Sequence, residues 1–121
     1  MTPAAHIAAA IEILDLILSG ENAEASLTKW GRSNRFAGSG DRNAIRDIVF
    51  DALRQKNSLT KRSKKISGRS WIIALLKKRE VNVDEYFGTS RYSPPEIKKW
   101  ELDLLPIKSE SDLHDIPDWL W

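Results

Sequence analysis

Apolar residues near the start of the chain recur at the spacing of an α-helix. The stripe advances in steps of four, three and four residues and consists of Ile7, Ile11, Leu14 and Leu18. This period places the four side chains on one helical face. Pro3 suits a first helical position, where its missing N–H has no partner, and Gly20 suits a left-handed helix end. The pattern predicts a helix over residues 3–18.

Two further helices are predicted at about 22–34 and 41–55. Asn22 can cap the first of them, whose apolar face is weaker. Ser39 or Asp41 can cap the second, and an acid at that place also suits the helix dipole. The second helix has the clearer apolar stripe, made by Ile45, Ile48, Val49, Ala52 and Leu53.

The rest of the chain contains shorter helical patterns and no long strand alternation. Short helices are expected at about 59–65, 69–79, 83–87 and 94–100. The fold class is therefore predicted to be all-α, a bundle of five to seven short helices. We expect the helical domain to occupy residues 1–105, and residues 106–121 to form an extended C-terminal linker or tail.

Charge is distributed unevenly along the chain, although the formal net charge is only +2. Residues 1–53 have a net charge of −2, residues 54–79 have +10 with no acidic residue, and residues 80–121 have −6. Such an asymmetry is more informative about partners than the total. It predicts an anionic partner for the basic segment 54–79.

Nucleic-acid phosphate is the usual partner of such a basic segment. Residues 54–70 contain no aromatic residue, which argues against base stacking there and favours backbone contact. The predicted RNA contacts are Arg54, Lys56, Lys61, Arg62, Lys64, Lys65, Arg69, Lys77, Lys78 and Arg79, with Arg42 as a secondary candidate. The alternative is that this segment is only a solvated basic face, which the acidic tail balances. If the second helix packs alongside, Lys29, Arg32 and Arg35 could extend the basic surface.

Other kinds of chemistry have little support in the sequence. The absence of cysteine removes disulfides, thiolate metal sites and thiol nucleophiles. His6 and His114 lack the spacing of a metal site. Asp41, Asp47 and Asp51 lie along one predicted helix with arginines nearby, a pattern typical of ion pairs rather than of an acid–base dyad. No catalytic and no metal-binding residue is therefore assigned.

The end of the chain is rich in large apolar residues. Burial of each such side chain gains about 1.5–3 kcal/mol, so Trp119 and Trp121 are expected either to dock on the helices or to bind a partner. The partners considered are a methyltransferase domain and a second copy of the chain. No signal peptide and no membrane-spanning stretch is evident, so a cytoplasmic protein without membrane contact is expected.

Three segments carry a resemblance to a known family. Residues 38–54, GSGDRNAIRDIVFDALR, resemble the central helix of the NusB-like N-terminal domain of RsmB/Sun-type rRNA cytosine-5 methyltransferases. Residues 8–20, AAAIEILDLILSG, are similar to the opening helix of that domain. Residues 116–120, IPDWL, resemble the linker that leads into the methyltransferase domain.

The resemblance implies a NusB-like helical bundle that binds and positions RNA, with rRNA as the expected partner. In that family a following domain binds S-adenosylmethionine and uses paired cysteines. This sequence has no cysteine and ends where that domain would begin. We therefore expect a fragment or truncated relative that is not an enzyme and has no cofactor of its own. The alternative is a non-enzymatic protein–protein interaction module that uses its helices and Trp-rich tail.

Overall fold

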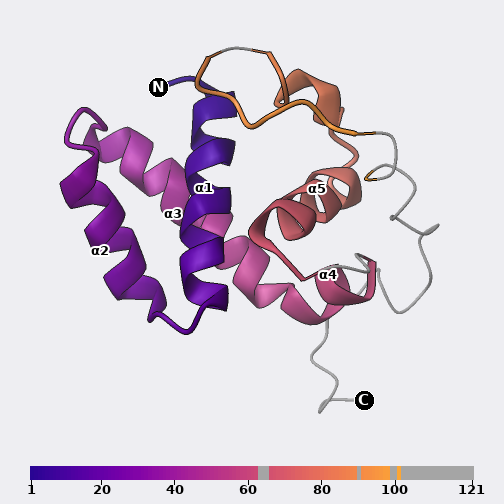
Figure 1. The fold of residues 1–121 in the computed structure, drawn as a ribbon, viewed down its shortest axis with the longest axis horizontal. Helices are drawn as coiled ribbons and strands as arrows, with labels where there is room; N and C mark the ends of the chain where they lie inside the picture. The colour runs from indigo at the N-terminus through magenta and orange to yellow at the C-terminus, as the bar shows by residue number, and fades with distance from the viewer. Residues whose placement is uncertain (63–65, 90, 99–100, 102–121) are drawn as a thin grey trace.

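The computed structural model describes residues 1–62, 66–89, 91–98 and 101, which form five α-helices and no strand (Figure 1). The elements are α1 (Pro3–Leu18), α2 (Ala23–Ser33), α3 (Ser39–Arg54), α4 (Lys56–Arg62) and α5 (Gly68–Lys78), followed by a 3-10 turn, η1 (Val83–Glu85). The predicted all-α class is thus confirmed. Within the described ranges, no helix combines the length and the apolar character that a membrane crossing requires.

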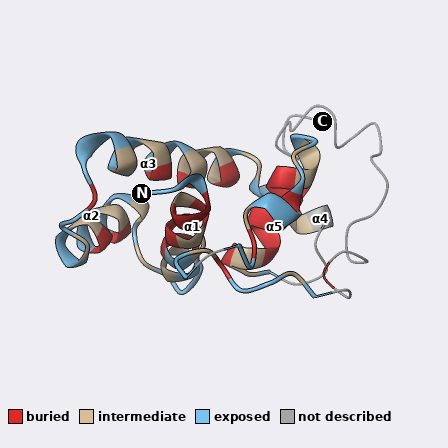
Figure 2. Cartoon of the chain, turned by 90° about the horizontal axis from the view of Figure 1, so that it is seen from above, coloured by how far each residue is buried: buried red, intermediate tan, exposed pale blue. Residues whose placement is uncertain are grey.

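Helix α1 lies in the middle of the bundle and contacts α2, α3 and α5 (Figure 1). Small residues such as Ala9 and Ala10 are buried in its contact surface, so neighbouring helices can approach closely. Larger core side chains come from α1 itself and from α3, α4 and α5, namely Ile13, Leu14, Ile45, Val49, Leu59, Ile72 and Leu75. Buried residues are concentrated on α1, on α5 and on the inward side of α3 (Figure 2).

Both ends of α1 carry the residues that its sequence pattern requires. The Thr2 hydroxyl accepts a hydrogen bond from the Ala5 N–H at 3.2 Å at the N-terminal end. At the other end Gly20 has a φ of 112°, and the Glu21 N–H donates to the Leu16 carbonyl at 3.2 Å. This arrangement is a Schellman motif, in which a left-handed residue lets the chain leave the helix. The expected helix end at Gly20 is confirmed.

Helix α5 ends in the same motif without a glycine. The Val81 N–H donates to the Leu76 carbonyl at 3.0 Å, and Glu80 takes the left-handed conformation with a φ of 61°. A side chain in this conformation costs about 1–2 kcal/mol. Val81 packs against the core, as the apolar residue after such a helix end often does. Burial of Val81 therefore offsets the unfavourable backbone of Glu80.

Helices α1 and α5 cross closely at Gly68, the first residue of α5. A Cβ atom at this position would lie 2.5 Å from the backbone oxygen of Ile11, well inside any real contact distance. The Gly68 N–H donates to Asp15 Oδ1 of α1 at 2.8 Å. The carboxylate of Asp15 thus lies at the positive end of the α5 dipole, where it is stabilising. Glycine at position 68 lets the two backbones meet.

The chain beyond η1 differs from the predicted helix over 94–100. Residues 94–97 form no helical turn; instead the Pro94 carbonyl accepts a hydrogen bond from the Gly88 N–H at 2.8 Å. The two successive prolines explain this, because Pro95 disfavours a helical conformation at Pro94. The Glu101 N–H donates to the Lys98 carbonyl at 2.9 Å, and residues 99–100 lie outside the described residues. The helix expected over 59–65 begins earlier, at Lys56. The predicted tail over 106–121 lies outside the described residues.

Replacing Gly68 by alanine should destabilise the protein by about 1–3 kcal/mol, because the new methyl group forces α1 and α5 apart. Gly31→Ala is the matched control: a Cβ there would meet only Arg42 Cδ, at an ordinary 3.7 Å. Since Gly31 lies inside α2, the control should gain up to about 1 kcal/mol. Urea denaturation followed by circular dichroism measures both. Equal effects of the two substitutions would contradict the close crossing.

Candidate nucleic-acid interface

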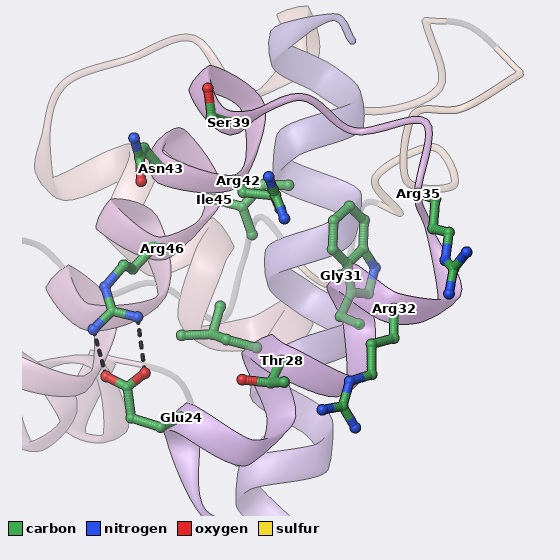
Figure 3. Close-up of a pocket in the computed structure, with 12 residues that line it drawn as sticks. Glu24, Thr28, Gly31, Arg32, Arg35, Ser39, Arg42, Asn43, Ile45 and Arg46 are labelled. Atoms are coloured by element: carbon green, nitrogen blue, oxygen red, sulfur yellow. Dashed lines mark hydrogen bonds and ion pairs between the residues drawn. The ribbon is translucent and has the colours of Figure 1, made fainter.

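A pocket of about 560 Å³ opens between α2 and α3 (Figure 3). Its inner wall is apolar and includes the buried side chains of Trp30 and Ile45. The lining also contains four exposed arginines, namely Arg32, Arg35, Arg42 and Arg46. We call this feature the arginine pocket. Its combination of an apolar base and a cationic rim is suited to an anionic ligand with some apolar surface.

One of the four arginines is neutralised within the protein. Arg46 Nη1 donates to Glu24 Oε2 at 2.9 Å, and its second terminal nitrogen bonds the other carboxylate oxygen (Figure 3). The hydrogen bond from Arg46 lowers the pKa of Glu24. The same guanidinium lies 4.9 Å from the centre of the Phe50 ring. Arg46 therefore links α2 to α3 and adds no net charge to the pocket.

The other three arginines contribute uncompensated charge. Arg32 lies on α2, Arg35 on the loop after it and Arg42 on α3, with Arg42 reaching toward Gly31 (Figure 3). None of them forms an ion pair with a residue that the structure describes. Three like charges around one pocket repel one another unless an anion lies between them. This cluster is the strongest candidate binding site in the described part of the chain.

Asp41 holds the start of α3 and so positions Arg42. Asp41 Oδ2 accepts a hydrogen bond from the Gly38 N–H at 3.2 Å, while Oδ1 lies 2.9 Å from His6 Nε2 and 3.6 Å from the amino group of Met1. The contact with His6, followed by the Gly38 hydrogen bond, lowers the pKa of Asp41. The partners of Asp41 thus come from the start of the chain and its own helix end, and Asp41 does not pair with Arg42, which has no ion-pair partner among the residues that the structure describes.

Arg69, a predicted RNA contact, is engaged by the protein itself. It donates to both carboxylate oxygens of Glu101, at 2.7 and 3.0 Å, and to the backbone oxygen of Glu96 at 2.9 Å. Its guanidinium also lies 4.9 Å from the centre of the Phe87 ring. The hydrogen bond from Arg69 is the main cause of the lowered pKa of Glu101. Arg69 thus ties the C-terminal part of the described chain to α5.

Asp51 gathers a second group of the predicted cations. It forms an ion pair with Arg79 and lies 3.4 Å from Arg54 Nη2, while Gln55 donates to it at 2.7 Å. Burial raises the pKa of Asp51, but the hydrogen bonds from Gln55 and Arg79 outweigh it and the net shift is downward. The ion pair at helical spacing expected for Asp51 is present with Arg54, and the additional pair with Arg79 joins α3 to the end of α5.

The other predicted RNA contacts lie on α4, at the end of α5 or outside the described side chains. Lys56 is exposed on α4, Lys77 is half-buried, and Lys78 Nζ donates to the Ser58 hydroxyl at 3.3 Å. Beyond the described side chains lie Lys61, Arg62, Lys64 and Lys65, together with the partner-binding candidates Trp119 and Trp121. The roles assigned to these residues stay predictions.

The arginines of the arginine pocket can be identified in the sequence, but the sequence does not show that they line one pocket. Arg32 and Arg35 were candidates only on the condition that the second helix packs alongside, and Arg42 was a secondary one. That condition depends on tertiary packing, since the three residues approach one another only when α2 and α3 lie side by side. The clustering of charge within residues 54–79 was the stronger sequence signal.

No potential metal site is found among the described residues, because no three His, Asp or Glu side chains gather there. Comparison of the chain with protein-family models, with curated proteins and with solved structures gives no match.

The Arg69–Glu101 pair should make stability depend on pH. The folded-state pKa of Glu101 lies below its usual 4.5, so the pair contributes fully above about pH 4.5 and is lost as the pH falls through the lowered pKa. Because the Glu101 side chain is only 7% exposed, Glu101→Gln should cost about 1–3 kcal/mol at neutral pH. The free energy of unfolding of the Glu101→Gln variant should also fall less steeply than that of the wild type between about pH 5 and pH 3.

Thermal unfolding at a series of pH values measures this difference. Glu96→Gln is the matched control, because it removes a neighbouring exposed carboxylate and should leave the pH profile unchanged. Identical acid profiles for Glu101→Gln and the wild type would show that the pair contributes nothing.

Proposed function

We propose that this chain is an RNA-binding helical domain that holds the RNA backbone in the arginine pocket. The observation that carries the proposal is the convergence of Arg32, Arg35 and Arg42 on one pocket without a carboxylate partner among the described residues. Guanidinium groups bind phosphate through paired hydrogen bonds, and several of them along a groove suit a chain of phosphates. The domain binds RNA and performs no catalysis of its own.

The resemblance of residues 38–54 to the NusB-like domain of rRNA methyltransferases supports rRNA as the partner. The same segment builds α3, which supplies Arg42 and one wall of the arginine pocket. Under this proposal S-adenosylmethionine belongs to a separate catalytic domain. Trp119 and Trp121 are then the candidates for contact with such a domain.

The basic segment takes a secondary place in the proposal. Arg69 and Arg79 already have carboxylate partners, and an RNA phosphate would have to compete with those partners for them. Lys56 is exposed on α4 and can add a contact without such competition. Lys61, Arg62, Lys64 and Lys65 follow it in the sequence and stay further candidates for RNA contact.

RNA affinity should depend steeply on salt. Contact with four to six phosphates predicts that log K falls against log[salt] with a slope of about −3 to −5. Replacing Arg32, Arg35 and Arg42 by glutamine should weaken binding at least about tenfold and reduce the slope by about 2, because three phosphate contacts are lost. Fluorescence anisotropy with a labelled single-stranded RNA of about 12 nucleotides measures both quantities.

A second triple variant controls for net charge. Replacing Arg54, Lys56 and Lys61 by glutamine removes the same number of charges outside the pocket and should weaken binding less. Circular dichroism verifies that both variants keep their helices. Equal losses for the two variants would remove the arginine pocket from the proposal. A flat salt dependence or no binding at low salt would overturn RNA binding itself.

A further inference from the structure

A second pocket, of about 530 Å³, shares the side chain of Trp30 with the arginine pocket. Its lining comes from α1, from the end of α2 with the loop after it, and from Tyr92. The segment after η1 that carries Tyr92 passes over the start of α1 (Figure 1). Its lining is largely apolar and includes Met1, Ala5, Ala8, Phe36 and Tyr92. We call it the aromatic pocket. The two pockets are therefore neighbours that use Trp30 as a common wall.

The aromatic pocket gathers side chains that a protein normally buries. Phe36 is 72% exposed, Tyr92 is 69% exposed and Met1 is 41% exposed. They are three of the five large apolar residues that are exposed in the described part of the chain. An aromatic ring in water does not gain the free energy of burial. Several exposed rings at one place therefore mark a binding surface.

We propose that the aromatic pocket takes an unpaired base of the RNA whose phosphates lie in the arginine pocket, an inference that rests on the proposed function. Continuity between the pockets supports it, because Arg35 of one precedes Phe36 of the other and Trp30 lines both. Arg91 adds positive charge at the edge, with its guanidinium 5.6 Å from the centre of the Tyr92 ring. Exposed rings beside arginines are the usual surface for single-stranded RNA.

The polar groups of this pocket favour a base over a phosphate. Its lining side chains include the carboxylate of Glu12 and no cation, and the ammonium of Met1 lies 3.6 Å from the carboxylate of Asp41. A carboxylate repels phosphate but accepts hydrogen bonds from the amino groups of bases. Paired bases in a duplex are stacked on one another and cannot enter. The pocket thus selects single-stranded segments, and the arginine pocket binds the backbone that carries them.

The test compares a single-stranded RNA with an abasic oligomer that has the same number of phosphates. The wild-type chain should bind the base-bearing strand about tenfold more tightly, because one stacked base contributes about that factor. Replacing Phe36 and Tyr92 together by leucine should remove most of this preference and leave the affinity for the abasic oligomer unchanged. Both side chains are exposed, so the fold should persist, which circular dichroism verifies.

The matched control replaces two exposed apolar residues outside both pockets, Leu18 and Ile66, by alanine, and should retain the preference. Equal binding of both oligomers by the wild type would overturn the stacking proposal and leave RNA binding intact, and the aromatic pocket would then serve another ligand, such as a protein. A preference that survives the leucine substitutions would also overturn it. If neither oligomer binds at low salt, the proposed function falls and the stacking proposal falls with it.

Discussion

Helix α5 lies against α1 with no side chain between them at Gly68, and this contact places α5 on the central helix of the bundle. The hydrogen bond from the Gly68 N–H to Asp15 fixes the N-terminal end of α5 on α1, so α5 can carry its apolar face into the core. Helix α2 packs on the opposite half of α1 from α5 (Figure 1), while α3 contacts α1 and also α5. Both candidate pockets lie on this second half.

The cations of the chain fall into two groups that differ in their use. Arg46, Arg69 and Arg79 each hold a carboxylate of another element, and two of them also lie over an aromatic ring. Such pairs fix the relative position of helices and segments. Arg32 and Arg42 are instead left without a partner among the described residues, which a protein tolerates at a surface that meets an anion. The density of charged residues along the sequence does not distinguish the arginines that have a carboxylate partner from those that have none among the described residues.

The long helices could be predicted from the sequence because apolar spacing, the Asn22 cap of α2 and the glycine end of α1 are local signals. The helix ending at Gly20 is an example. The predicted cap of α3 was wrong, because its N-cap is Gly38 and not Ser39 or Asp41. The expected helix at Pro94 was wrong, since a single hydrogen bond to Gly88 and the following proline override a weak local pattern. The candidate site was only partly predictable. Which arginines have partners depends on carboxylates far away in the sequence, such as Glu101 for Arg69, and no local pattern contains that information.

The position of the Met1 amino group has a consequence for the chemistry of the chain's first residue. This ammonium lies 3.6 Å from Asp41, the carboxylate that begins α3, and Met1 itself lines the aromatic pocket. Acetylation or a fused peptide would replace the ammonium by a neutral amide. The His6 ring would then be the side-chain partner left to Asp41 among the described residues, with Nε2 2.9 Å from Oδ1. The covalent state of the amino group of Met1 thereby changes the charge next to Asp41 at the start of α3.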